Sequence, residues 1–279
     1  MNILKLLLGL LLLVIRVQAQ TDSLYLWNNE VPNEKKIKSA PVPATLEDGT
    51  IRVVEVTNPF LAVFEPEPKN KNGKAIIVCP GGAYVRLAVH KEGYTIANWL
   101  NELGYTVFVL HYRVPSKRDG ALQDFQRSVK LIRHNAQKYG IDPLKVGALG
   151  FSAGAHLAAR AGMTEPEQTY PEQDASDIQS GKPACMILIY PSYLDEGPNR
   201  SLSPGLKANI NTADTFIFQT MDDNGATSSF VLATALQRVK ANVELHMLPA
   251  GGHGYGMNSG NKAAETWPKL LSVWLTEHL

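Results

Sequence analysis

The stretch that decides the fold is Val146-Gly147-Ala148-Leu149-Gly150-Phe151-Ser152-Ala153-Gly154-Ala155-His156-Leu157. Residues typical of a buried strand run directly into a Gly-x-Ser-x-Gly turn, and a helix-forming run follows. The turn is so tight that its flanking positions, Gly150 and Gly154, must lack bulk, and it holds the serine hydroxyl clear of the sheet. We therefore predict that Ser152 is a nucleophile; the alternative is a serine in an ordinary strand–helix turn.

Short apolar runs alternate with amphipathic stretches of helical length on both sides of this turn. One helix is expected over about 121–139, because Leu122, Phe125 and Val129 share one face. Gly140 is the expected terminator of that helix. Apolar strands separated by helices predict the α/β class, with a mostly parallel twisted sheet covered by helices on both faces. The expected strands are Ala75–Cys79, Thr106–His111, Val146–Leu149, Met186–Tyr190, Phe216–Gln219 and Val243–Leu248, and the other helices cover about 90–103, 153–162, 227–241 and 261–278.

The chain before the first of these strands has a different character. Residues 20–49 contain several prolines, and we expect an extended arm that lies on the surface. Residues 51–56 and 61–64 are rich in strand formers, and the Asn58-Pro59 turn between them predicts a hairpin or meander. The remaining length, residues 50–279, suits one domain with a single core.

The least regular parts of that domain are residues 163–183 and 191–213. A cap over a site would lie in these segments. Both are short, so the sequence predicts a small cap or none.

A serine hydroxyl is a poor nucleophile at neutral pH, and it needs a neighbouring base that is oriented by an acid. His253 is the candidate base among the seven histidines, because it lies in a glycine-rich loop after the last expected strand. The acid should follow a strand between Ser152 and His253 in chain order. Asp222 and Asp223 both do so, and we favour Asp223. The alternative for His253 is a solvated loop residue.

A tetrahedral intermediate carries an oxyanion, which preorganised backbone N–H groups stabilise. Ala153, directly after the predicted nucleophile, offers one such donor. Gly82 and Ala83 follow the strand expected over 75–79 and are the candidates for the others, because glycine lets the backbone approach closely. Tyr84 lies beside these donors, and we predict that it lines the substrate pocket; the alternative is a packing role.

Other polar residues near these segments have a simpler interpretation. Polar side chains at helix starts and strand ends mostly cap helices or pair with each other. His156, one helical turn after Ser152, is expected to pack away from the nucleophile. The capping and pairing interpretation applies to Lys91, Glu92, Tyr112, Arg113 and Asp124.

The N-terminal residues 1–19 look like a secretory signal. Lys5 precedes a short apolar run, and Val17-Gln18-Ala19 has the small-residue spacing of a cleavage site. The apolar run is shorter than the roughly 20 residues that span a bilayer. We expect export to the periplasm or beyond, and no membrane span in the mature chain; the alternative is an uncleaved anchor.

Charge and cysteine content exclude several classes of protein. Lys and Arg number 27 against 26 Asp and Glu, a formal net charge of +1. This balance gives no electrostatic reason to expect nucleic acid as a partner. Cys79 and Cys185 lie in expected buried strands, so we predict two free thiols, and their spacing does not suggest a metal site.

Several segments of the sequence form a recognisable set. They are Pro80-Gly81-Gly82-Ala83-Tyr84, His90-Lys91-Glu92-Gly93, His111-Tyr112-Arg113-Val114, Gly150 to Ala158, Ile189-Tyr190-Pro191 and Gly251 to Gly256. Over residues 50–279 the chain resembles the α/β-hydrolase esterases of bacterial polysaccharide utilisation, the acetyl-xylan-esterase-like and feruloyl-esterase-like enzymes. The resemblance implies the α/β-hydrolase fold and ester hydrolysis without a cofactor. It also implies Ser152 as nucleophile, His253 as base and Asp223 as acid, although the loop after Asn224 is shorter than usual.

The function implied is a serine esterase that releases small acyl groups, acetyl first, from plant-type carbohydrate. The partner is then a small-molecule or polysaccharide ester. Alternatives are a feruloyl or general short-chain esterase and, outside enzymes, an inactive carbohydrate-binding scaffold. A xylanase needs two carboxylates flanking a sugar cleft, and no such pair is recognisable in the sequence.

Overall fold

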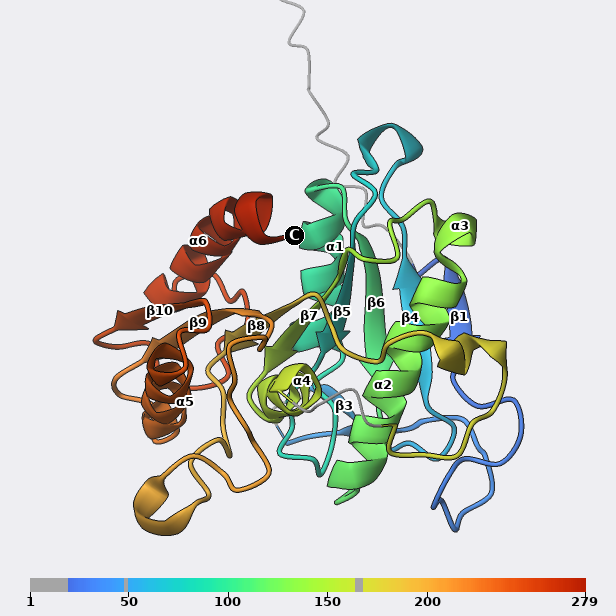
Figure 1. The fold of residues 1–279 in the computed structure, drawn as a ribbon, viewed down its shortest axis with the longest axis horizontal. Coiled ribbons are helices and arrows are strands. Elements are labelled where there is room, and N and C mark those ends of the chain that lie inside the picture. Colours follow the sequence, from blue (N-terminus) through green and yellow to red (C-terminus); the bar gives the residue numbers. More distant parts are fainter. Residues whose placement is uncertain (1–19, 48–49, 164–167) are drawn as a thin grey trace, which may run out of the picture.

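An eight-stranded sheet forms the centre of the protein (Figure 1). The structure is a computed structural model that describes residues 20–47, 50–163 and 168–279, so the predicted signal at residues 1–19 lies outside the described residues. The strands, in spatial order, are β1 (Asp22–Tyr25), β4 (Phe60–Phe64), β6 (Thr106–His111), β5 (Ala75–Cys79), β7 (Val146–Phe151), β8 (Cys185–Ile189), β9 (Asp214–Thr220) and β10 (Val243–Leu248). β4 is antiparallel to both of its neighbours, and the other pairs are parallel.

The predicted parallel strands are confirmed. β5, β6 and β10 have the predicted bounds, while β7 continues to Phe151 and the limits of β8 and β9 move by one or two residues. Because successive side chains of a strand point to opposite faces, the apolar runs supply both layers of the core. Ile77 and Cys79 belong to one buried cluster, and Ile76 and Val78 belong to the other.

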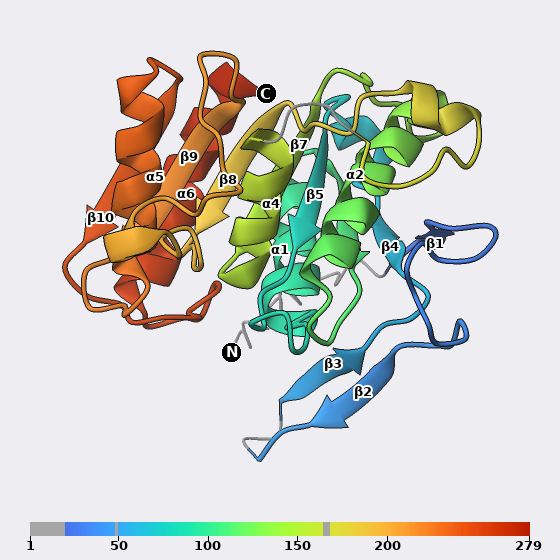
Figure 2. The ribbon, with the colours of Figure 1, turned by 60° about the horizontal axis from the view of Figure 1, so that its bottom comes forward.

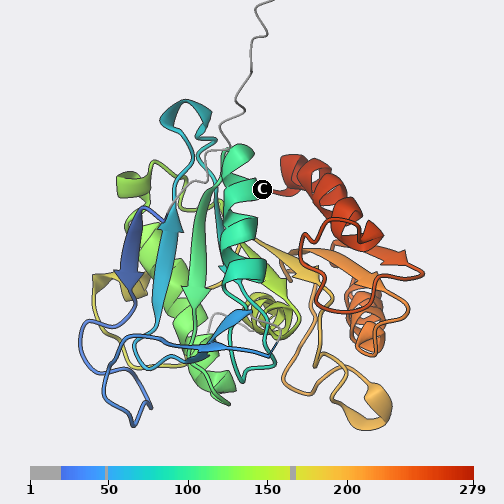
Figure 3. The same ribbon diagram turned by 180° about the vertical axis from the view of Figure 1, so that it is seen from behind.

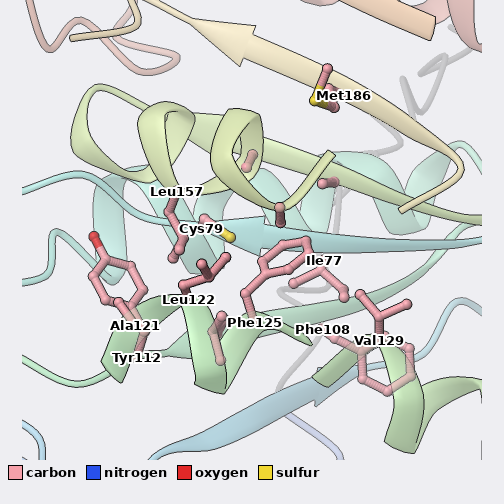
Figure 4. Close-up of a cluster of buried hydrophobic side chains, with 14 of the residues drawn as sticks. Ile77, Cys79, Phe108, Tyr112, Ala121, Leu122, Phe125, Val129, Leu157 and Met186 are labelled. Carbon is pink, nitrogen blue, oxygen red and sulfur yellow. The ribbon is translucent and has the colours of Figure 1, made fainter. Parts of the chain in front are cut away.

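Helices cover both faces of the sheet, as predicted. Figure 1 looks onto the face covered by α2, α4 and α5, and Figure 3 shows α1 and α6 on the opposite face. Figure 4 shows how the first face packs: Leu122, Phe125 and Val129 of α2 meet Ile77 and Phe108 of the sheet. The helices are a π-helical turn at His90–Tyr94 leading into α1 (Thr95–Glu102), α2 (Arg118–His134), α3 (Ala136–Tyr139), α4 (Ala153–Met163), α5 (Ala226–Arg238) and α6 (Lys262–His278).

The helix predicted over 121–139 begins earlier and is interrupted. α2 starts at Arg118, and Asn135 separates it from α3. Gly140 then adopts a left-handed conformation with φ of 64°, so the predicted glycine terminator is confirmed.

The predicted hairpin between residues 51–56 and 61–64 is wrong. β3 (Ile51–Glu55) instead pairs antiparallel with β2 (Val42–Thr45) in a separate two-stranded sheet, which Figure 2 shows apart from the main sheet. β4 lies between β1 and β6, and all five of its residues are buried. A strand that is apolar on both faces needs cover on both faces, and the large sheet provides it.

The prediction that residues 20–49 form a surface arm is wrong for its first part. β1 adds an edge strand to the main sheet, and the side chains of Leu26 and Trp27 are buried. The indole N–H of Trp27 donates a hydrogen bond of 2.9 Å to Asp124. Burial of the Trp27 ring stabilises the contact between this segment and the rest of the protein. The segment is therefore part of the domain and not a surface arm.

Two other predictions have clear outcomes. Arg113 pairs with Asp124 at 2.9 Å, as expected for polar residues that pair with each other. Cys79 and Cys185 are free and buried, and burial raises the pKa of the Cys185 thiol to about 12. None of the helices described is long and apolar enough to cross a membrane.

The segments where a cap was expected contain little regular structure. Their described residues include only the short 3₁₀ turns Ala175–Ile178 and Pro198–Arg200. Both segments nevertheless contact the domain, since Asp177 pairs with Arg127 and the backbone N–H of Leu194 bonds to Ser228. The described parts of these segments therefore form at most a small cap.

Candidate active site

Ser152 lies at the sharp turn between β7 and α4, with φ of 53°. A Cβ atom on Gly150 would lie 2.2 Å from the carbonyl oxygen of Gly154, and one on Gly154 would lie 2.0 Å from that of Cys79. Backbone atoms cannot move aside as a flexible side chain can. The predicted need for glycine on both sides of Ser152 is therefore confirmed.

Ser152, His253 and Asp223 form a continuous chain of hydrogen bonds. The hydroxyl oxygen of Ser152 lies 2.8 Å from Nε2 of His253, and Nδ1 of that ring lies 2.7 Å from Oδ2 of Asp223. The three residues follow β7, β10 and β9, whose carboxyl ends meet at the same edge of the parallel sheet. The structure thus brings together the three residues that the sequence singled out.

The surroundings of Asp223 and His253 hold both side chains in place. The second oxygen of Asp223 accepts a 2.8 Å hydrogen bond from the N–H of Gly225, and its side chain is 3% exposed. The ring of Tyr190 packs against that of His253 with centroids 5.0 Å apart. The imidazole is therefore held between a buried carboxylate and an aromatic ring, with Nε2 towards Ser152.

Asp222 has a different task from Asp223. Its carboxylate accepts hydrogen bonds from the backbone N–H groups of Gly251 and Gly252, at 3.1 and 2.9 Å. These two bonds lower the pKa of Asp222. Asp222 therefore anchors the loop that carries His253, while Asp223 contacts the imidazole itself.

Three backbone N–H groups beside Ser152 have no acceptor among the described residues. They belong to the predicted donors Gly82, Ala83 and Ala153. Gly82 and Ala83 have φ of 133° and 58°, and they line a cavity of about 240 Å³ together with Ser152 and His253. A Cβ atom on Gly82 would lie 2.0 Å from the carbonyl oxygen of Arg86, so this turn requires glycine.

The prediction that Tyr84 lines the substrate pocket is wrong. Its side chain is 2% exposed, and its hydroxyl lies 2.8 Å from Nδ1 of His156. His156 packs away from Ser152, as predicted, and burial, together with the charges of Arg160 and Arg118, lowers its pKa to about 3. Burying the Tyr84 ring is more favourable in free energy than exposing the ring to the cavity. Aromatic packing therefore decides the position of Tyr84.

Two residues near Ser152 were not predicted from the sequence to belong to the site. Glu92, expected to be a helix cap or ion-pair partner, is buried and accepts hydrogen bonds from the N–H of Gly81 and the hydroxyl of Tyr190, at 2.8 and 2.9 Å. Burial raises the pKa of Glu92. The hydroxyl of Ser192 lies 3.4 Å from that of Ser152. Neither residue has a local sequence signal, because both contacts are made across the fold.

The chemistry available at the site comes from these side chains and backbone groups. Across the ranges that the structure describes, no group of three or more His, Cys, Asp or Glu is arranged to hold a metal ion. The arrangement suits attack by a hydroxyl on a carbonyl, because Ser152, His253 and the donors Gly82 and Ala83 line one cavity. Asp223 reaches this cavity only through its hydrogen bond to His253.

Sheet order, helix layers and the strained serine turn together define an α/β hydrolase. Residues 61–189 match the BD-FAE family. The chain is 28% identical to an acetyl ester-xyloside bifunctional hydrolase from Caldicellulosiruptor lactoaceticus, with a TM-score of 0.72 over 91% of this chain and 95% of that one. It is also 27% identical to an acetylxylan esterase of Xylanibacter ruminicola and 31% identical to an endo-1,4-beta-xylanase B of Butyrivibrio fibrisolvens.

The chain spans 53% of the length of the acetylxylan esterase and 32% of that of the xylanase, whose matches cover 96% and 64% of this chain. The protein has the α/β-hydrolase fold and is similar to acetylxylan esterases.

Proposed function

We propose that the protein is a serine carboxylester hydrolase that removes acetyl groups from plant-type polysaccharides or oligosaccharides. The observation that carries the proposal is the unbroken chain of hydrogen bonds from Ser152 through His253 to Asp223. It opens on a cavity lined by Gly82 and Ala83. A hydroxyl, a base and an acid in this order are the parts that acyl transfer needs.

In the first half of the reaction, Nε2 of His253 takes the proton of the Ser152 hydroxyl while its oxygen attacks the ester carbonyl. Asp223 accepts a hydrogen bond from the Nδ1–H group of His253. This bond selects the tautomer whose Nε2 can take the proton of Ser152, and it stabilises the imidazolium. The N–H groups of Gly82, Ala83 and Ala153 stabilise the oxyanion. The intermediate collapses, the sugar hydroxyl leaves with the proton from His253, and the acetyl group stays on Ser152.

In the second half, water replaces the sugar. His253 removes a proton from the water as it attacks the acetyl carbonyl, and the same N–H donors stabilise the second oxyanion. Acetate then leaves, and the proton on His253 returns to Ser152. No cofactor is needed, because each proton and electron pair in these steps is supplied by substrate, water or these side chains.

Acetyl as the acyl group is supported by the small cap and by the cavity of about 240 Å³ beside Ser152. The relatives named for acetyl ester chemistry support the same choice. A feruloyl or general short-chain esterase is the alternative. Glycoside hydrolysis, which the xylanase and the bifunctional hydrolase are named for, has less support. It uses two carboxylates across a sugar cleft, and among the described residues Glu92 is the one carboxylate that lines the cavity.

A series of p-nitrophenyl esters, together with acetylated xylo-oligosaccharides, tests the proposal. We expect kcat/KM to fall from acetyl to octanoyl and acetate to be released from the oligosaccharide. Each methylene that a hydrophobic pocket accommodates is worth up to about 0.8 kcal/mol, so a long-chain enzyme gives a rising series. A series that climbs towards octanoyl, without acetate from the sugar, would exclude a carbohydrate esterase.

The inactive carbohydrate-binding scaffold is distinguished in the same experiment. A scaffold binds the acetylated oligosaccharide without turnover, and Ser152→Ala then changes nothing. An esterase releases acetate, and the same substitution abolishes that release.

We also propose that the protein is exported and that residues 1–19 are removed on the way. The support is the charged start, the apolar run and the small residues before Gln20. Expression of the full chain in a bacterial host, followed by fractionation and N-terminal sequencing, tests this. Mature protein beginning at Gln20 outside the cytoplasm is expected, and an intact Met1 in the cytoplasmic fraction would refute it.

A further inference from the structure

Three cationic residues, Arg52, Arg86 and Lys91, line the cavity beside Ser152. Arg52 and Lys91 also line an adjoining cavity of about 360 Å³, to which His90 contributes. Among the described residues, none of the three cations forms an ion pair.

These cations come from two parts of the chain, β3 and the segment after β5, and backbone hydrogen bonds join the two parts. Arg52 belongs to β3, which is joined to the loop after β5 by two hydrogen bonds between Val53 and Leu87, of 3.1 and 2.7 Å. Arg86 precedes Leu87 in that loop. Lys91 packs against Gly256, where a Cβ atom would lie 3.1 Å from Cγ of Lys91. The cationic cluster is thus built into the fold.

The acidic groups nearby are already engaged with other partners. The carboxylate of Glu92 accepts from Gly81 and Tyr190, and that of Asp223 faces His253 and Gly225. Neither forms an ion pair with a cation of the cluster, although the charge of Lys91 acts on the Glu92 carboxylate. Among the described residues, three cations and one carboxylate line the cavity, and the field of this positive excess attracts an anion.

A second cavity, of about 330 Å³, provides a contrast within the same molecule. It is lined by Arg118 and Arg160, but each of these has its own acid. Arg118 pairs with Glu196 at 2.8 Å, and Arg160 pairs with Asp119 at 2.8 Å. Within the described ranges, Arg52, Arg86 and Lys91 have no such ion pairs, so a counter-charge is expected from the substrate.

We propose that the cluster of Arg52, Arg86 and Lys91 binds a carboxylate on the sugar part of the substrate. The preferred substrate is then an acetylated oligosaccharide that carries a uronic acid. Guanidinium groups suit this ligand, because their fork of N–H donors matches a carboxylate. The inference rests on the proposed ester hydrolysis and adds the charge of the substrate, which the relatives' names do not mention.

The test compares two acetylated xylo-oligosaccharides of equal length, one with and one without a glucuronic acid. One charge-assisted contact is worth about tenfold in affinity. We therefore expect kcat/KM to be about tenfold higher for the acidic substrate at low salt. The ratio should fall towards one at about 1 M salt, where charges are screened within about 3 Å. A ratio of one at low salt overturns the proposal.

Variants locate the effect. Arg52→Gln and Lys91→Gln should each lower the acidic-to-neutral ratio several-fold, while Lys269→Gln, an exposed charge on α6 that lines neither cavity, should leave it unchanged. Because the readout is a ratio within one preparation, partial misfolding does not imitate it. An unchanged ratio in both variants overturns the assignment of the cluster.

Two further arms separate other outcomes. The first compares hydrolysis of p-nitrophenyl hemisuccinate with that of p-nitrophenyl butyrate. If the enzyme prefers the hemisuccinate but not the oligosaccharide with the uronic acid, the cluster binds a carboxylate on the acyl group. That result would overturn the assignment to the sugar. The second measures binding of both oligosaccharides to Ser152→Ala by calorimetry. It tests the cluster even if no ester is hydrolysed, so failure of the proposed activity is seen separately.

Discussion

The carboxylate of Glu92 accepts a 2.8 Å hydrogen bond from the backbone N–H of Gly81. Its other oxygen accepts from the hydroxyl of Tyr190, which in turn accepts from the N–H of Gly256 at 3.1 Å. One buried side chain thus joins the turn that carries Gly82 to the loop that follows His253. Glu92 is a positioning residue for both sides of the site.

Replacing Glu92 tests this role. In Glu92→Ala, the N–H of Gly81 and the hydroxyl of Tyr190 lose their buried acceptor, at a cost of about 1–3 kcal/mol for each unsatisfied group. We expect a lower free energy of unfolding and a lower kcat, with partial recovery in Glu92→Gln, whose amide oxygen replaces one acceptor. Denaturant unfolding and ester kinetics measure both. Glu277→Ala, exposed on α6, is the matched control, and equal behaviour of Glu92→Ala and this control would refute the role.

Stability should also depend on pH through Glu92. Burial raises the pKa of its carboxyl. A group whose pKa is raised by folding contributes stability below its unfolded pKa, and the contribution is lost as the pH rises through the folded pKa. The difference in unfolding free energy between wild type and Glu92→Gln should therefore shift against the wild type as the pH rises above about 4.3, the ordinary pKa of a glutamate. A difference that stays constant as the pH rises, or moves the other way, contradicts it.

Ser152→Ala should abolish ester hydrolysis while the fold stays intact. The substitution removes the covalent route and leaves only binding and oxyanion stabilisation. Circular dichroism and p-nitrophenyl acetate kinetics measure the two properties. In the wild type, a fluorophosphonate should label Ser152, as read by peptide mass spectrometry. A label on another residue, or an active alanine variant, would reject Ser152 as the nucleophile.

Asp223→Asn and Asp222→Asn should differ strongly. Asp223 contacts His253, and its loss leaves the imidazole in the wrong tautomer, which costs about 10⁴-fold in kcat in the serine protease example. Asp222 contacts Gly251 and Gly252, so its loss should loosen the loop and lower activity far less. Steady-state kinetics of both variants decide the matter, and a crippled Asp222→Asn beside an active Asp223→Asn would exchange the two roles.

Cys79 and Cys185 should both react with a thiol reagent after denaturation without reductant, and neither should react in the native protein. Both are buried, and burial raises the pKa of each thiol, which suppresses the reactive thiolate. A spectrophotometric thiol titration before and after addition of denaturant measures this. Two thiols in the native state would mean that the strands open readily, and none after denaturation would mean a disulfide.

The features that could be predicted from the sequence depend mainly on short stretches of neighbouring residues. The Gly-x-Ser-x-Gly turn predicted Ser152, since a turn this tight depends on neighbouring residues alone. Apolar runs predicted β5 and β6 with their bounds, because a strand buried on both faces needs one continuous run. The bounds of the edge strand β10 were also predicted. Chain order predicted His253 and the pair Asp222 and Asp223, because a parallel sheet places the loops after its strands at one edge. The contact of Asp223 with His253 distinguishes the two acids.

Only the tertiary structure decided which distant segments touch. β3 joins Leu87 rather than forming a hairpin with β4, and this contact brings Arg52 to the cavity beside Ser152. Trp27 reaches Asp124 across 97 positions, and Glu92 reaches Tyr190 across 98. Such contacts depend on which buried surfaces match and which buried polar groups need partners, and these conditions exist only once the whole chain has packed.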